Sequence, residues 1–121
     1  MNVWFQHSKN NYLTTINAKN KTQMKKIINT SNAPAPIGPY NQAILSGNML
    51  YISGQIAINP ETNELVTRTI VDETKQVMEN LNAILKEAGM DFENVIKTSI
   101  FVSDMNNFSQ INEVYGEYFN Q

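Results

Sequence analysis

The chain has 121 residues, no cysteine, one histidine and a formal net charge of −2. This length supports a single domain. The lack of cysteine excludes disulfides, thiolate nucleophiles and cysteine-ligated metal, and an isolated His7 predicts neither a zinc site nor a catalytic triad. No apolar run approaches the roughly 18 to 20 residues of a membrane helix, and the polar N-terminus lacks a secretory core. We therefore expect a soluble, cytoplasmic protein with no membrane partner and no metal.

Basic residues are concentrated near the N-terminus, where five lysines precede the first acid, Glu61. A basic arm can bind nucleic acid, but here asparagine and threonine dilute the charge, so we predict disorder for residues 1–23 and no nucleic-acid partner. The stretch also lacks the arginine typical of an organellar transit peptide, which favours the cytoplasm. Met24 is the expected start of the domain.

The first predicted elements are strands. After a short segment at 25–29, three prolines within 31–40 exclude a helix. Segments 41–45 and 49–56 alternate as strands do, and the intervening Ser-Gly-Asn predicts a tight hairpin turn. A turn-rich loop follows at 59–63.

A long amphipathic helix is predicted at 70–88, because apolar or small residues recur at steps of three and four. These residues are Ile70, Thr74, Val77, Met78, Leu81, Ile84, Leu85 and Ala88. Thr69 and Asp72 are typical of its N-terminal cap, and Gly89 of its end.

A further strand is predicted at 95–102, which is rich in β-branched residues, and a second helix capped within 104–107. Phe108, Ile111, Tyr115 and Phe119 place an apolar stripe on this helix, and we interpret its aromatic residues as packing. Two helices with apolar faces need a larger sheet than these few strands provide. Either partner chains complete the core or residues are missing, and we favour missing residues.

Three blocks carry a resemblance to the reactive intermediate deaminase (Rid) family, of RidA or YjgF type. Segment 35–42 resembles the family's N-terminal signature and segment 51–55 its second block. Segment 97–105 resembles the family's strand-then-helix block. That block continues through Phe108, Asn112, Tyr115 and Phe119.

The resemblance implies an α+β domain over residues 24–121, with a mixed or antiparallel sheet carrying both helices on one face, as in chorismate-mutase-like folds. It further implies a homotrimer with clefts between subunits. Family members continue into two final strands, which supply an arginine that binds the substrate carboxylate and a glutamate that positions water. These strands are missing here, so the domain is expected to be incomplete at its C-terminus. Arg68 does not match the family's position and is expected to be a solvated loop cation.

The candidate substrate-binding residues are Tyr40, Ser53, Gly54 and Asn112, each carried over by resemblance; the catalytic residues stay unassigned. Tyr40 offers a phenol hydroxyl, or simply packs after the proline turn. Gly54 allows close backbone approach to a ligand, or is a strand glycine at a bulge. Ser53 binds ligand or caps the strand end, and Asn112 donates its amide or is a plain polar helix residue.

By resemblance, the expected function is 2-iminobutanoate/2-iminopropanoate deaminase: hydrolysis of the reactive enamines and imines released by pyridoxal-phosphate-dependent dehydratases, giving 2-keto acids and ammonia. The expected partner is a small imino or keto acid, and no cofactor is expected. The alternative is a non-catalytic module that binds small carboxylates or protein partners, which the lack of the family's arginine and glutamate favours.

Overall fold

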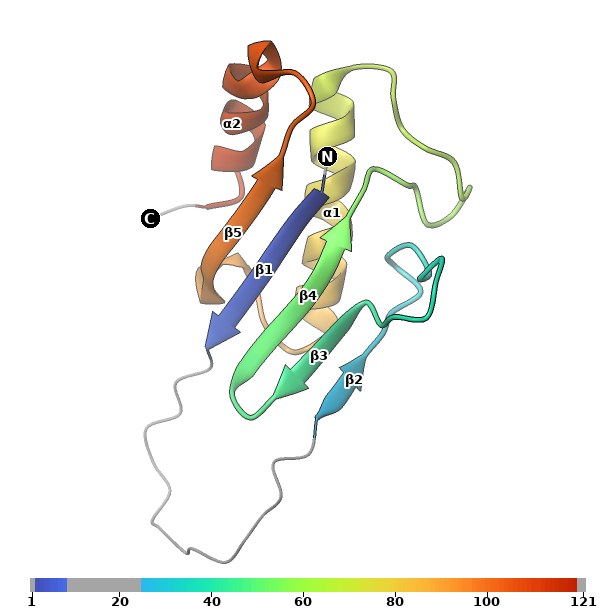
Figure 1. The fold of residues 1–121 in the computed structure, drawn as a ribbon, viewed down its shortest axis with the longest axis vertical. Coiled ribbons are helices and arrows are strands. Elements are labelled where there is room, and N and C mark those ends of the chain that lie inside the picture. The colour runs from blue at the N-terminus through green and yellow to red at the C-terminus, as the bar shows by residue number, and fades with distance from the viewer. Residues whose placement is uncertain (1, 9–24, 120–121) are drawn as a thin grey trace, which may run out of the picture.

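The computed structural model describes residues 2–8 and 25–119. Its elements are β1 (Asn2–Ser8), β2 (Lys26–Ile28), β3 (Ala43–Ser46), β4 (Met49–Gln55), α1 (Ile70–Glu87), β5 (Val95–Phe101) and α2 (Phe108–Gly116), with 3₁₀ turns at Phe92–Asn94 and Met105–Asn107. The strands form one sheet in the order β2-β3-β4-β1-β5, and both helices lie on the same face of it (Figure 1). Each neighbouring pair is antiparallel. The predicted α+β architecture is confirmed.

The position of β1 differs from the sequence-based prediction. Residues 2–8 were expected to belong to a disordered extension, but they form a strand between β4 and β5; the rest of that prediction, residues 1 and 9–23, lies outside the described part. His7, expected in an unpatterned tail, pairs through its backbone with Leu50 and Val95. The segment contains Val, Trp and Phe, which favour strands, but its pairing partners lie more than forty residues along the chain, beyond the reach of a local pattern.

The core lies between the sheet and α1. Val77, Leu81 and Ile84 on the helix are fully buried, as is Leu50 on β4. Complete burial of each such side chain stabilises the fold by about 1.5 to 3 kcal/mol. The Thr69 hydroxyl accepts from the Asp72 backbone N–H at the start of α1 (3.1 Å). The periodicity and cap that predicted this helix are therefore confirmed.

Two glycines lie where the sequence predicts a hairpin turn and the end of a helix. Gly47 has φ 60° in the β3–β4 hairpin, and Gly89 has φ 70° just after α1. Both values lie in the left-handed region, which glycine enters without the steric cost of a Cβ. The predicted hairpin turn and helix end both depend on this freedom.

Aromatic side chains join the end of α2 to the rest of the core. The Phe92 ring lies 5.3 Å from that of Tyr118 and 5.2 Å from that of Phe119, and Tyr115 and Phe119 are 4.5 Å apart. The hydroxyls of Tyr115 and Thr98 are 2.6 Å apart, which ties α2 to β5. Tyr115 and Phe119 thus pack as predicted, whereas Phe108, at the start of α2, is half exposed.

Tyr118→Phe is expected to make folding less sensitive to alkaline pH. Burial, and then the charges of Glu79 and Glu117, raise the pKa of the Tyr118 phenol above its ordinary value. A group whose pKa is higher in the folded state contributes stability below its ordinary pKa, and this contribution is lost as pH rises through the folded value. The free energy of unfolding, measured in urea between about pH 8 and pH 11, should therefore fall less in the variant. An equal fall in both proteins would contradict this.

Candidate functional site

The loop between β2 and β3 is organised by the buried side chain of Gln42. Its Nε2 donates to the carbonyl oxygens of Thr30 (3.0 Å), Ala33 (3.1 Å) and Pro34 (2.9 Å), and its Oε1 accepts from the Thr30 N–H (2.6 Å). The proline-rich loop has few backbone donors of its own, because proline has no N–H. The side-chain amide of Gln42 therefore supplies hydrogen bonds to backbone groups of the loop that have no partner in a helix or strand.

Tyr40 stands at the end of this loop, on a turn made by Gly38. The Tyr40 N–H donates to the Gly38 carbonyl (2.8 Å), and the Ile37 N–H donates to the Tyr40 hydroxyl oxygen (3.2 Å). A Cβ added at Gly38 would lie 3.4 Å from the Tyr40 ring, which is ordinary van der Waals contact, so the ring packs directly beside this position of the turn. The ring is half exposed. Its oxygen already accepts a hydrogen bond, and its own hydrogen remains available to a ligand.

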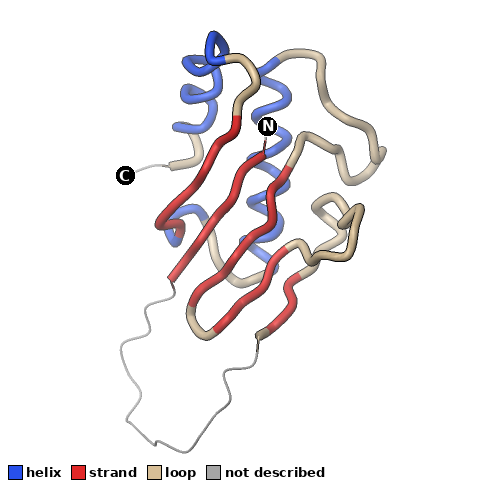
Figure 2. The backbone as a smooth tube through the Cα atoms, viewed as in Figure 1, coloured by secondary structure: helices blue, strands red, loops and turns tan. Residues whose placement is uncertain are grey.

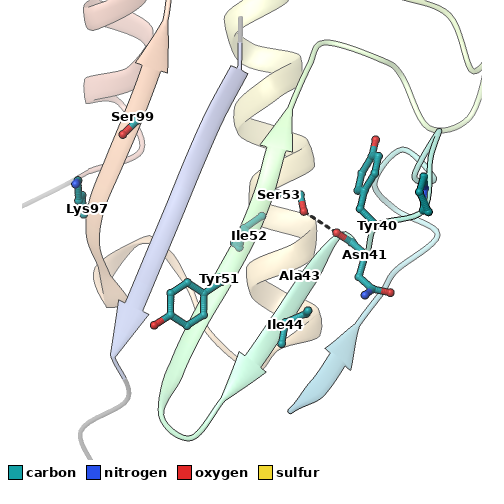
Figure 3. A pocket seen from close by; sticks show the side chains of 10 residues that line it. Tyr40, Asn41, Ala43, Ile44, Tyr51, Ile52, Ser53, Lys97 and Ser99 are labelled. Atoms are coloured by element: carbon teal, nitrogen blue, oxygen red, sulfur yellow. Dashed lines mark hydrogen bonds between the residues drawn. The ribbon is translucent and has the colours of Figure 1, made fainter.

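Ser53 and Gly54 form a β-bulge in β4. Val3 pairs with Gln55 and Phe5 with Ile52, so two residues of β4 oppose one residue of β1. The Ser53 hydroxyl donates to the Asn41 carbonyl (2.7 Å; Figure 3), and the Ser53 N–H donates to the Gln42 carbonyl (2.9 Å). The hydroxyl hydrogen and the backbone N–H of Ser53 thus both donate within the protein, while its hydroxyl oxygen can still accept a hydrogen bond from a ligand.

Tyr40 and Ser53 form a wall shared by two concavities. The first, of about 540 Å³, lies over the face of the sheet that the helices leave open (Figure 3). It is lined by Pro39, Tyr40, Asn41, Ala43, Ile44, Tyr51, Ile52, Ser53, Lys97 and Ser99. The second, of about 440 Å³, lies beneath the proline-rich loop and includes Gly54. Its other lining residues are Pro34, Ala35, Pro36, Ile37, Tyr40, Gln42, Ser53, Gln55, Ile56 and Ile58.

Asn80 anchors the wall of the second concavity opposite the proline-rich loop. This α1 residue is 1% exposed, and its Nδ2 donates to the carbonyl oxygens of Ile56 (3.0 Å) and Ile58 (2.9 Å). The Gln76 amide in turn donates to Asn80 Oδ1 (3.0 Å). Gln42 and Asn80 therefore hold the two sides of one cavity. Neither was predicted as a site residue, although an asparagine on the apolar face of a predicted helix is a signal of a buried amide with partners.

The structure brings together three of the four predicted substrate-binding residues. Tyr40, Ser53 and Gly54 line the second concavity, whereas the exposed Asn112 on α2 lines neither one. α2 packs against α1 and lies beside β5, at the opposite edge of the sheet from β2 and β3 (Figure 2). Within this chain, Asn112 is therefore separate from the other three residues.

Arg68 lies outside both concavities. Its side chain is 84% exposed, and its Nε donates to the carboxylate of Asp72 (3.1 Å). Hydrogen bonds from Arg68 and from the Thr69 hydroxyl lower the pKa of Asp72 below its ordinary value. Arg68 thus matches the expected surface loop cation, here paired with the first turn of α1.

The described part of the chain contains neither a cluster of metal-binding side chains nor a candidate membrane span. Within the two described ranges, 2–8 and 25–119, no group of three or more His, Asp or Glu side chains is placed to hold a metal ion. Over the same residues, no helix has the length and apolar character needed to cross a membrane.

Comparison with known proteins places this chain in a family. Residues 30–121 match the family model described as Endoribonuclease L-PSP. A RutC family protein of Pyrococcus horikoshii is 54% identical over 98 residues, which cover 81% of this chain and 78% of that protein. The mouse protein named 2-iminobutanoate/2-iminopropanoate deaminase is 48% identical over 96 residues, covering 79% of this chain and 71% of that protein.

Solved structures agree with the sequence comparison. A Rid-family protein of unknown function from Yersinia pestis superposes with a TM-score of 0.78 at 47% identity, covering 80% of this chain and 77% of that one. Escherichia coli TdcF with bound serine gives a TM-score of 0.75 at 41% identity, covering 78% and 73%. With a family model that spans most of the chain, and with this likeness in sequence and in fold, the chain belongs to the Endoribonuclease L-PSP family and is a Rid protein of the RidA or YjgF type.

Proposed function

We propose that this protein is a 2-iminobutanoate/2-iminopropanoate deaminase, which hydrolyses the enamine and imine products of pyridoxal-phosphate-dependent dehydratases to 2-keto acids and ammonia. The observation that carries the proposal is the meeting of Tyr40, Ser53 and Gly54 in one concavity. The identity of 48% to the mouse protein named for this activity supports it.

The reaction needs a held carboxylate, a positioned water and a path for protons. Water adds to the imine carbon, and the carbon–nitrogen bond then breaks to release ammonia. The Tyr40 hydroxyl can donate to the carboxylate, and the Ser53 hydroxyl oxygen can accept from the water or from the protonated imine nitrogen. The side chains of Pro36, Ile37 and Ile58 offer an apolar wall for a short alkyl chain. Rate enhancement would come mainly from proximity and orientation, and we propose no cofactor.

The proposed assembly is a homotrimer with the ligand held in clefts between subunits. Ile27 pairs with Ile44, and Ile44 with Tyr51, so these side chains form a row on one face of the sheet. The adjacent row of Ile28, Ala43 and Ile52 is buried toward the helices, which places the first row on the open face. Ile27 and Tyr51 are about half exposed, which supports burial of this face by another subunit. Asn112 would then reach a cleft from the neighbouring subunit.

Tyr51→Glu is expected to convert the assembly to monomer. The substitution places a charge in the apolar row, where burial by another subunit would remove it from water without a partner. Size-exclusion chromatography with light scattering measures the molar mass. Phe108→Glu, at an equally exposed aromatic residue at the start of α2, serves as the control and should leave the mass unchanged. A wild-type monomer, or an unchanged mass for Tyr51→Glu, would contradict the proposed interface.

The activity is tested by following keto-acid release from imine that a threonine dehydratase generates, with and without this protein. We expect faster release with the protein present. Tyr40→Phe should slow the protein-dependent rate by roughly tenfold or more, since a hydrogen bond to a charged ligand contributes about 1.5 to 3 kcal/mol. Tyr118→Phe, the same change away from both concavities, should leave that rate unaltered near neutral pH. No acceleration by the wild-type chain would remove the enzyme hypothesis.

A second candidate is a non-catalytic module that binds small carboxylates or a protein partner. This candidate is favoured because the Rid resemblance implies an arginine that binds the substrate carboxylate. Arg68, the one arginine in the sequence, lies outside both concavities. The serine bound to Escherichia coli TdcF supports a ligand with a carboxylate. Calorimetric binding of 2-ketobutyrate without turnover would support the module. RNA affinity that falls steeply with salt would instead support the activity in the family's description.

A further inference from the structure

β1 lies where the sheet would otherwise divide. It pairs with β4 from Val3↔Gln55 to Ser8↔Met49, and with β5 from Asn2↔Phe101 to His7↔Val95. In the strand order, β4 and β5 are neighbours of β1 and not of each other (Figure 1). The β2-β3-β4 part of the sheet is therefore joined to β5 through β1.

This joining strand lies outside the part of the chain that matches the family. The family model covers residues 30–121, which include β3, β4, β5 and both helices, and β1 precedes this range by more than twenty residues. β4 and β5, which both lie within the match, are thus held in one sheet by a segment that lies outside it.

The first concavity depends on the same strand. Tyr51 and Ser53 line it from β4, and Lys97 and Ser99 line it from β5. Figure 3 shows β1 running between these two pairs of residues. Two strand spacings of about 4.7 to 4.9 Å set the separation of β4 from β5. Without β1, each of these strands would expose unpaired N–H and C=O groups along its inner edge.

We infer that residues 2–8 are an integral strand of this domain, donated in cis, which positions the β5 wall of the concavity against the β4 wall. The inference is independent of the reaction proposed above. Residues 2–8 thus have a structural and site-forming role, although the sequence alone predicted that they belong to a disordered extension.

Amide hydrogen exchange on the full wild-type chain is the first test. Backbone amides within residues 3–7 should exchange at least tenfold more slowly than in an unstructured peptide of the same sequence, because a hydrogen-bonded strand must open before it exchanges. The protection should persist at concentrations where light scattering shows a monomer. Exchange at the rate of the free peptide would overturn the inference, and protection that is lost in the monomer would overturn its cis form.

A pair of variants at one position tests the coupling to the site. Gln6 pairs with Tyr51 on one side and with Lys97 on the other. Gln6→Pro removes the backbone N–H that a central strand uses, whereas Gln6→Thr keeps it and has high strand propensity. Protection of β4 and β5 amides should fall at least tenfold in Gln6→Pro, or the variant should fail to fold, while Gln6→Thr should behave as wild type. Wild-type protection and stability in Gln6→Pro would overturn the inference whether or not the protein proves to be a deaminase.

Discussion

Gln42→Leu is expected to lower the free energy of unfolding by roughly 3 kcal/mol or more, because it removes one partner from a group of buried hydrogen bonds. The side chain is 3% exposed and serves four backbone groups: three carbonyls and the Thr30 N–H. Leucine has similar volume but no polar atoms. Each backbone group that stays buried and unpaired costs about 1 to 3 kcal/mol, and the loop can recover part of this only by opening to water.

Urea unfolding measures the loss, and the same denaturation applied to Gln110→Leu supplies the control. Gln110 is an exposed residue of α2, where the same substitution should change stability by less than about 0.5 kcal/mol. Because Tyr40 closes the loop that Gln42 supports, ligand affinity should fall along with stability. Equal stabilities of the two variants would show that the Gln42 hydrogen bonds are replaced by water at no cost.

Asn80→Leu is expected to destabilise the fold by roughly 2 to 4 kcal/mol. The substitution leaves the Ile56 and Ile58 carbonyls without their donor, at a position that is 1% exposed, and takes an acceptor from Gln76. The segment after β4 would lose its attachment to α1. The effect should therefore include weaker protection of residues 56–58 against hydrogen exchange, in addition to a lower unfolding midpoint.

Asn82→Leu, two residues along the same helix, is the matched control. Asn82 is only partly buried, and we expect a change of less than about 1 kcal/mol. If Asn80→Leu were as stable as Asn82→Leu, the Asn80 hydrogen bonds would not anchor the cavity wall. Both amides support the second concavity from opposite sides, so the double variant Gln42→Leu/Asn80→Leu is expected to leave the chain unfolded.

The regular elements were predictable because their signals are local. The three- and four-residue spacing from Val77 to Leu85 indicated α1, Gly47 indicated the hairpin turn, and Gly89 the helix end. Their boundaries agree with the structure to within one or two residues. The second helix was less exact, since Met105–Asn107 forms a 3₁₀ turn before α2 begins at Phe108.

The site was only partly predictable. Tyr40, Ser53 and Gly54 came from blocks that resemble the Rid family, and the structure places them in one concavity. Their division of hydrogen-bonding roles was not visible in the sequence: the Tyr40 oxygen accepts from Ile37, and the Ser53 hydroxyl donates to Asn41. Such roles depend on which backbone groups lie nearby, and the sequence motif does not specify them.

Sequence patterns alone were enough to predict the family, the two helices, the β3–β4 hairpin and three of the residues that line the second concavity. The strand that residues 2–8 form between β4 and β5, and the support of the second concavity by Gln42 and Asn80, became visible only in the folded chain. The two groups of features differ in the range of the interactions that produce them. Helix periodicity and turn chemistry act over a few residues, whereas Asn80 bonds a carbonyl 24 residues away and β1 pairs with strands still more distant.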